Sequence, residues 1–307
     1  MTTSRAGTSA DAVTRLRVSA AGAVLRKVAG PDPTAARAAV HQAPGPRWFP
    51  PDSAIARVHG DASMFVGGIR ALLLQSLHPR AMAAVAAHSG YRGDPWGRLQ
   101  RTATYLAQTT FGPVEQAEQA VAVVRSVHRR VVGVSEEGEP YAASDPDLLA
   151  WVHLAEVDSF LLAHQRYGRR PLDDAGCDAY VAQTAQVGER LGAQDLPRTV
   201  VELHTALGAY RPQLRGTRPA REAAEFLHHE TPLPAVARPF FEALWGAAVA
   251  LLPVWARPEL GLPVLRRPEG VAARAGGLAM THAIRWALDA ADPGGPPGEE
   301  HRGGPTA

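Results

Sequence analysis

The 307-residue sequence predicts an all-α fold, a helical bundle of about ten helices. Three observations predict it. Apolar residues recur at helical spacing along most of the chain. Asp-Pro pairs and single Ser, Thr or Asp residues precede these stretches, as helix N-caps do. Alternating runs of Val, Ile and Thr, which are typical of strands, are nearly absent.

Composition agrees with a globular domain that is not specialised for polyanions. Hydrophobic residues make up 46% of the chain, enough for a sizeable core. The formal net charge is +2, which gives no general attraction to nucleic acid or to membrane surfaces. Cys177 is the only cysteine, so an intramolecular disulfide and a cysteine-based zinc or iron–sulfur site are excluded.

Capping signals place each helix in turn. In the first half, Ser53 caps a short helix, Asp61 caps a long apolar one, and Asp94 precedes Pro95 at the start of another. The predicted helices are a short one after Ser53, then 61–77, 79–88, 95–111 and 113–132. The stretch 134–143 is the best hairpin or loop candidate. Further helices are predicted at 145–167, after Asp173 or Asp174 to Leu191, and at 199–210, 219–229, 235–252 and 272–290.

The ends of the chain differ in composition from its middle. We expect residues 1–44 to be a disordered or loosely attached helical extension and 45–265 to be one helical domain. Residues 266–291 are predicted to form a C-terminal helix, and the Gly- and Pro-rich stretch 292–307 to be a disordered tail. The N-terminus lacks the apolar core of a secretory signal, and the longest apolar stretch, 243–256, is too short for a membrane span. A cytoplasmic protein is expected.

Several familiar catalytic motifs are absent. The sequence has no G-x-S-x-G elbow, no phosphate-binding Walker loop, no G-x-G-x-x-G after a strand and no H-E-x-x-H. A di-iron carboxylate bundle requires two Glu-x-x-His pairs on different helices, and only Glu225-x-x-His228 is present. That pair is better explained as an exposed helix end.

A polar helix face is predicted between residues 94 and 111. Arg98, Arg101, Thr102 and Tyr105 fall at i, i+3, i+4 and i+7, so they share one face. Two neighbouring guanidiniums repel, and a buried pair would require an anion such as a carboxylate. Spacing alone favours the simpler alternative, a solvated basic face or a salt bridge to another helix.

A histidine stands on an apolar stripe in the segment LLAWVHLAEVDSFLLAHQRY. His153 shares that stripe with Leu149, Glu156, Val157, Phe160 and His164. A buried neutral imidazole needs a partner. The more frequent partner is a buried hydrogen-bonding group, and the alternative is a metal, most simply a haem iron held by one histidine in an apolar pocket.

Two segments together resemble a known family. LHPRAMAAVAAHSGYRGDPWGRLQRT, followed by DPDLLAWVHLAEVDSFL, is similar to the MpaB-type oxygenases and the latex-clearing proteins, which are rubber oxygenases, over roughly 48–262. The resemblance implies an all-helical fold around a haem b pocket, with His153 as the proximal iron ligand. It also implies that Arg98, Arg101 and Thr102 contact the cofactor, and that Arg101 and Thr102 take part in catalysis.

The sequence departs from the family at one position. Where the rubber-cleaving members have a lysine that can occupy the sixth coordination site of the iron, this chain has Arg101. A guanidinium offers no lone pair to a metal, so an open or water-bound distal site is expected, with His78 as the second candidate for a distal ligand. The departure, like the missing secretion signal, argues against rubber cleavage.

These expectations lead to one principal function. The chain is expected to be a haem b-dependent oxygenase that acts with dioxygen on an apolar small molecule and takes electrons from a donor where the reaction requires one. The alternatives are a non-catalytic haem carrier or sensor, and a helical interaction scaffold without a cofactor. An absorption spectrum would separate the last from the other two.

Overall fold

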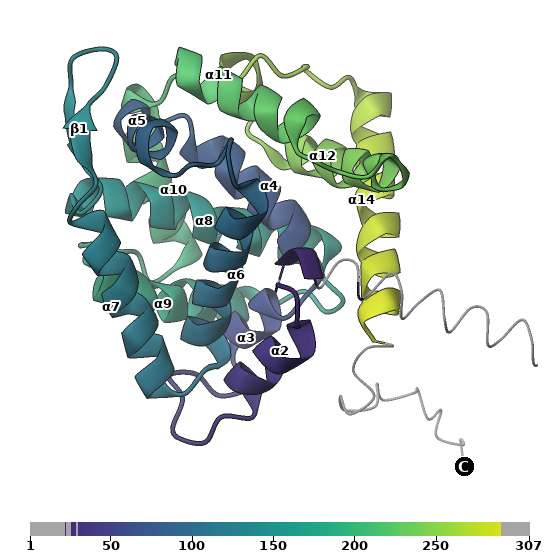
Figure 1. The fold of residues 1–307 in the computed structure, drawn as a ribbon. Helices are drawn as coiled ribbons and strands as arrows, with labels where there is room; N and C mark the ends of the chain where they lie inside the picture. Colours follow the sequence, from purple (N-terminus) through teal and green to yellow (C-terminus); the bar gives the residue numbers. More distant parts are fainter. Residues whose placement is uncertain (1–21, 23–25, 29, 290–307) are drawn as a thin grey trace, which may run out of the picture.

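The computed structural model describes residues 22, 26–28 and 30–289, and in them it confirms the all-α prediction (Figure 1). Eleven of its helices have at least seven residues. The α-helices are α2 Pro33–His41, α3 Ala54–His59, α4 Met64–Gln75, α5 Pro79–His88, α6 Pro95–Phe111, α7 Val114–His128, α8 Pro146–Tyr167, α9 Asp174–Leu191, α10 Val200–Tyr210, α11 Arg218–Glu225, α12 Arg238–Leu251, α13 Ala256–Glu259 and α14 Arg267–Leu288. The short elements are 3₁₀ turns at Arg211–Gln213 and Ala235–Ala237, a π turn at Phe226–Glu230, and strands β1 Val132–Val134 and β2 Pro140–Ala142.

The predicted caps act as local start signals. The Asp94 carboxylate accepts a hydrogen bond from the Gly97 amide at 2.8 Å, which fixes the first turn of α6. Asp145 and Asp173 cap α8 and α9 in the same way. At α10, Thr199 and Glu202 form a capping box. These four starts lie where the sequence predicts them, because a cap needs only neighbours within the same turn.

Three boundaries differ from the prediction. α4 begins at Met64 because Asp61 is paired with Arg285 and does not cap the helix. α7 ends at His128 and not near Val132, since Val132 pairs with Ala142 in an antiparallel hairpin. That hairpin confirms the turn predicted at 134–143. α14 starts at Arg267, five residues before the helix predicted at 272–290 and at the beginning of the C-terminal segment predicted at 266–291.

Helix α8 is the centre of the bundle (Figure 1). It is buried on nearly every side, as expected of a helix that is apolar all round, and it packs against α4, α9 and α10. The approach of α4 is close: a Cβ added at Gly67 would lie 2.7 Å from Cδ1 of Phe160. Glycine at this position therefore allows the backbone of α4 to lie directly against the Phe160 side chain of α8.

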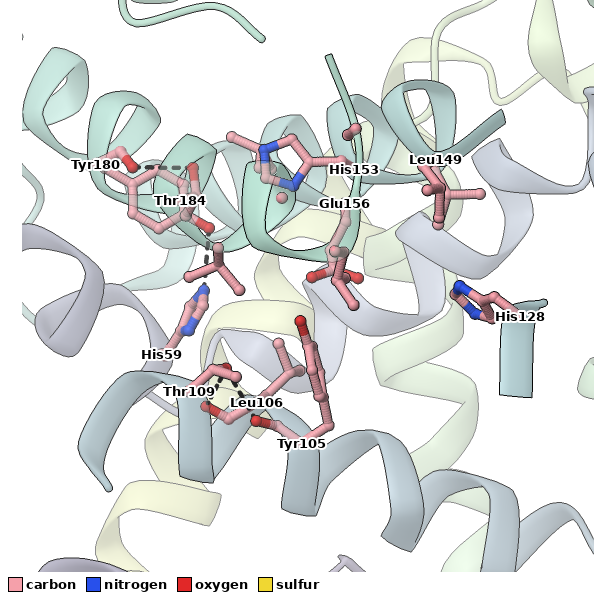
Figure 2. A pocket seen from close by; sticks show the side chains of 16 residues that line it. His59, Tyr105, Leu106, Thr109, His128, Leu149, His153, Glu156, Tyr180 and Thr184 are labelled. Carbon is pink, nitrogen blue, oxygen red and sulfur yellow. Dashed lines mark hydrogen bonds between the residues drawn. The ribbon is translucent and has the colours of Figure 1, made fainter. Parts of the chain in front are cut away.

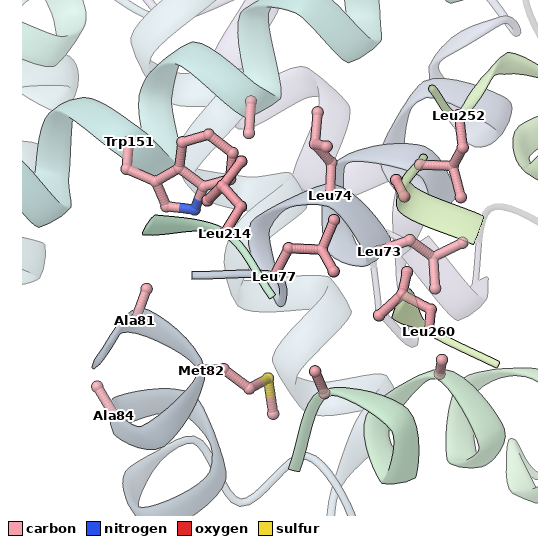
Figure 3. Close-up of a cluster of buried hydrophobic side chains, with 14 of the residues drawn as sticks. Leu73, Leu74, Leu77, Ala81, Met82, Ala84, Trp151, Leu214, Leu252 and Leu260 are labelled. Atoms are coloured by element: carbon pink, nitrogen blue, oxygen red, sulfur yellow. The ribbon is translucent and has the colours of Figure 1, made fainter. Parts of the chain in front are cut away.

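The main apolar core lies between α4, α5 and α8 (Figure 3). Leu77 and Trp151 are completely buried in it, and the indole nitrogen of Trp151 donates to the backbone oxygen of Gln75 at 3.1 Å. A buried ion pair crosses the same helices. Arg70 on α4 lies 2.7 Å from Asp158 on α8, and it donates to the backbone of Leu251 on α12.

The C-terminal helix α14 packs along α12 and against the end of α8. Arg285 binds Asp61 with two hydrogen bonds, of 2.8 and 3.0 Å, and also donates to the backbone of Tyr167. The predicted disordered tail, 292–307, and most of the predicted N-terminal extension lie outside the described residues. Within the described residues, no helix is long and apolar enough to cross a membrane.

Candidate functional site

A pocket lies between α6, α8 and α9, and α3 and the end of α7 contribute to its walls (Figure 2). Its cavity measures about 90 Å³. The walls are mostly apolar. The polar and titratable side chains on them are His59, Tyr105, Thr109, His128, His153, Glu156, Tyr180 and Thr184.

The predicted histidine stripe of α8 faces this pocket. Leu149, His153, Glu156 and Val157 line it, whereas Phe160 and His164, the last two residues of the predicted stripe, lie buried outside it. Neither ring nitrogen of His153 has a hydrogen-bond partner within the described residues. Burial lowers the pKa of His153 to about 4, and the imidazole is therefore neutral at pH 7 and keeps a free lone pair.

A glycine of α9 makes room for this imidazole. A Cβ added at Gly188 would lie 2.9 Å from Nδ1 of His153 and 2.5 Å from Cδ1 of Leu196. Both distances are shorter than normal van der Waals contacts. The ring of His153 therefore lies directly against the backbone of α9, a contact between residues 35 positions apart in sequence.

Two further polar groups of the pocket lack partners. The hydroxyl of Tyr105 on α6 is buried and makes no hydrogen bond. The carboxyl of Glu156 makes none within the described residues, and burial raises its pKa to about 7. The pKa of Tyr105 is also raised, mainly by burial and further by the charge of Glu156. Figure 2 shows the Tyr105 hydroxyl directed toward Glu156 across the pocket.

Apart from His128, the remaining polar residues of the wall form hydrogen bonds with neighbouring groups. Nδ1 of His59 lies 2.8 Å from the hydroxyl of Thr110, and its Nε2 lies 3.2 Å from the hydroxyl of Tyr180. Burial lowers the pKa of His59 to about 3, so this histidine is a neutral link in a hydrogen-bonded chain. Thr184 donates back to its own helix.

His128 is a site residue that the sequence motifs above do not single out. It is the last residue of α7 and lines the pocket, its Nδ1 is buried without a partner, and burial lowers its pKa. The signal was present in the sequence. Ala117, Val121, Val124 and His128 follow one another at i, i+4, i+7 and i+11, which continues the buried face of α7 to its end.

Only one residue of the polar face predicted on α6 lines the pocket. Tyr105 lines the pocket, and Arg98 is partly buried two turns away on the same face, about 10 Å along the helix axis. Burial lowers the pKa of Arg98, and its guanidinium forms no hydrogen bond within the described residues. Arg101 and Thr102 do not line the pocket. The Arg101 side chain is 65% exposed and pairs with Asp94, and exposed Thr102 donates to the backbone of Arg98.

Two other predicted positions lie away from the pocket. His78 is only 2% exposed and packs between Trp151 and Tyr210 in the main core, where neither ring nitrogen has a partner. His228 is hydrogen-bonded to Glu242 at 2.8 Å and stacks on the Trp245 ring. The imidazole therefore has protein partners, as expected if the Glu225-x-x-His228 pair is not a di-iron motif. Among the described residues, no three His, Cys, Asp or Glu side chains are placed to hold a metal ion.

Comparison with known proteins identifies the family. The model of the family described as "ER-bound oxygenase mpaB/B'/Rubber oxygenase, catalytic domain" matches residues 56–286. The match covers the whole pocket and extends through most of α14. No curated protein and no solved structure matches the chain. The chain belongs to the family of MpaB-type and rubber oxygenase catalytic domains.

Proposed function

We propose that this chain is a haem b-dependent oxygenase whose cofactor binds in the pocket of α6, α8 and α9 with His153 as the axial iron ligand. The observation that carries the proposal is the His153 imidazole, which is neutral, has no hydrogen-bond partner within the described part of the chain and faces an apolar cavity. A haem iron needs little more from the protein than one such nitrogen in apolar surroundings. Membership of an oxygenase family supports the same chemistry.

The side chains that line the pocket suit haem, but the volume of the pocket is small. Its walls supply histidine nitrogen for the iron and aliphatic side chains, including Leu106, Val152 and Val187, for the macrocycle. The cavity of about 90 Å³ is smaller than the roughly 300–1,000 Å³ of typical cofactor pockets, so haem binding would require the side chains of the walls to move apart.

Arg98 is the residue best placed for a propionate. It is the buried cation on the face of α6 that also carries Tyr105, and a buried guanidinium without a partner is stabilised by a carboxylate. We retain Arg101 and Thr102 as candidates for the rim of the site, where their exposure lets them meet a group in the mouth. His78 remains a distal-ligand prediction without support from its position in the core.

His128 is a second candidate for the axial ligand. It lines the same cavity from α7 and also has a nitrogen without a partner within the described residues.

When bound, haem supplies dioxygen binding and redox chemistry. His153 would supply the nitrogen that holds the iron, and the aliphatic walls would exclude water. Burial keeps His59 neutral, and its two hydrogen bonds fix its ring.

The absorption spectrum of the protein produced with haem available tests this proposal. We expect a Soret band in the wild type and in His164→Ala, and its loss in His153→Ala. His164 is a matched control because it is a buried histidine of the same helix that does not line the pocket. Loss of the band in His128→Ala, with His153→Ala unchanged, would transfer the ligand role to His128. A wild type without haem would refute haem binding.

Dioxygen consumption tests the oxygenase half of the proposal. Haem-loaded protein is supplied with a reductant and with candidate apolar substrates, and oxygen uptake is followed with an electrode. We expect uptake that depends on the substrate and disappears together with the Soret band in the ligand variant. A stable haem protein that consumes no oxygen with any substrate would favour the carrier or sensor alternative.

A further inference from the structure

The solvent side of helix α14 is apolar. The opposite side packs on α12: a Cβ added at Gly277 would lie 2.6 Å from Cβ of Ala247, and Ile284 is buried. Figure 1 shows α14 at the edge of the described fold, and between residues 271 and 286 its exposed positions are Val271, Ala272, Arg274, Ala275, Leu278, Ala279, His282, Ala283 and Trp286. From residue 275 to residue 288, no Asp, Glu, Lys or Arg of this helix is exposed. A surface helix usually carries charges toward solvent, so this apolar side indicates a contact surface.

The first turn of α12 adds to this surface. A Cβ added at Gly246 would lie 3.7 Å from Cβ of Ala273, and one added at Gly276 would lie 3.7 Å from Cβ of Ala243. The contacts move back along α12 as they move forward along α14, so the two helices run antiparallel. Phe240, one turn before Ala243, therefore lies beside the turn of α14 that follows Gly276, and it is 55% exposed. We call Phe240 and the exposed side of α14 the α14 surface.

The spacing of the small residues on this surface favours another helix as its occupant. Ala272, Ala275, Ala279 and His282 follow one another at intervals of three, four and three residues, which is the spacing of a coiled-coil seam. Alanines on such a seam let two helix axes approach to about 8 Å. A helix that binds a membrane surface instead carries large apolar side chains along the centre of its apolar face. The α14 surface therefore fits a helix of a partner protein better than it fits lipid.

The charges at the two ends of α14 are complementary to those of a second α14. Arg267 is the first residue of the helix, Asp289 directly follows its last residue, and both are exposed. Antiparallel copies place Arg267 of each copy near Asp289 of the other, and they also bring opposite ends of the helix dipoles together. Asp289 is otherwise held only by an exposed ion pair with Arg169, which is weak. Residue 278 is midway between residues 267 and 289, so a two-fold axis would pass close to Leu278.

We propose that two copies of this chain form a symmetric antiparallel dimer through the α14 surface. Two-fold dimers that use the same surface on both copies are the most common oligomers of soluble proteins. A helix of 22 residues is about 33 Å long and about 10 Å wide, so two copies bury on the order of 700 Å² through α14, and more through Phe240. Interfaces below about 1,200 Å² belong to weak complexes, so the dissociation constant should be micromolar. This inference is independent of haem binding.

Sedimentation equilibrium of the full-length protein measures this association. We expect a monomer–dimer equilibrium in the wild type and a dissociation constant higher by about tenfold or more in Ala279→Arg, because the two added arginines would repel each other near the two-fold axis. Ala122→Arg is the matched control, since Ala122 is also an exposed alanine within a helix, α7, and this change should leave the dissociation constant unaltered. A wild type that is monomeric at all concentrations, or equal weakening by the two substitutions, would overturn the inference.

Cross-linking of introduced cysteines tests the antiparallel direction. In Leu278→Cys the two thiols lie near the two-fold axis, and a short bis-maleimide should join the two copies. In Val271→Cys each thiol lies seven residues from the axis, so the pair is about 21 Å apart and should not be joined. The wild type, whose Cys177 is buried, gives the background. Cross-linking of both variants would show parallel helices and cross-linking of neither would show a different interface, and either result would contradict the proposed dimer.

Vesicles test the other occupant of the surface. The wild type is sedimented with vesicles of phosphatidylcholine alone and of phosphatidylcholine with phosphatidylglycerol. The dimer predicts no vesicle binding that depends on the α14 surface. Binding by a monomeric wild type that Ala279→Arg abolishes would show that this surface meets lipid, and the dimer would be refuted.

Discussion

Replacing Gly188 by alanine tests whether the pocket depends on the contact between α9 and the imidazole of His153. The added methyl group would lie 2.9 Å from Nδ1 of His153 and 2.5 Å from Cδ1 of Leu196, so one of these groups must move. Overpacking of this kind costs about 1–3 kcal/mol of folding free energy. The better helix propensity of alanine returns about 0.5–1 kcal/mol. We expect a net loss of about 1 kcal/mol and a melting temperature lower by roughly 2–4 °C.

Gly208→Ala in α10 is the matched control. Nothing lies within 4 Å of a Cβ added at Gly208, so this substitution gains helix propensity without a steric cost. The free energy of unfolding, measured by urea denaturation, should therefore be about 1–3 kcal/mol higher for Gly208→Ala than for Gly188→Ala. If haem binds as proposed, the Soret band should shift in Gly188→Ala alone, because only this change displaces His153. Equal stability of the two variants would show that the close approach of α9 to His153 does not constrain the ring.

Two further predictions concern charges outside the cavity. Arg98→Ala should lower haem retention during gel filtration several-fold more than Arg101→Ala, because Arg98 is a half-buried cation whose guanidinium makes no hydrogen bond within the described residues, whereas Arg101 forms an exposed pair that contributes at most about 1 kcal/mol; equal retention would remove the propionate role from Arg98. For Asp61, burial alone would raise the pKa, but hydrogen bonds from Arg285, Ser63 and the backbone lower it to about 2. Because the folded pKa lies below the ordinary aspartate value of 3.8, this group stabilises the fold above pH 4 and loses that contribution, about 2 kcal/mol, as the pH falls toward 2. Asp61→Asn should therefore lower stability at pH 7 and weaken its dependence on pH between 4 and 2 in urea denaturation, and an unchanged pH profile would contradict the assignment.

The sequence determined the helices and the side of α8 that matters. Asp94, Asp145 and Asp173 cap the helices they were predicted to cap, since a cap forms within one turn and its geometry is local. The apolar stripe around His153 was also readable, because every fourth residue of a helix faces the same way. The family followed from motifs that extend over both segments, and the family model covers them.

Only the tertiary structure decided which polar groups share a cavity. The distances between Gly188 and His153, and between His59 and Tyr180, depend on how helices far apart in sequence pack, which no local pattern encodes. The same packing buries the Tyr105 hydroxyl at the pocket with no hydrogen-bond partner among the described residues. It leaves Arg101, one turn away on the same helix, exposed and paired with Asp94.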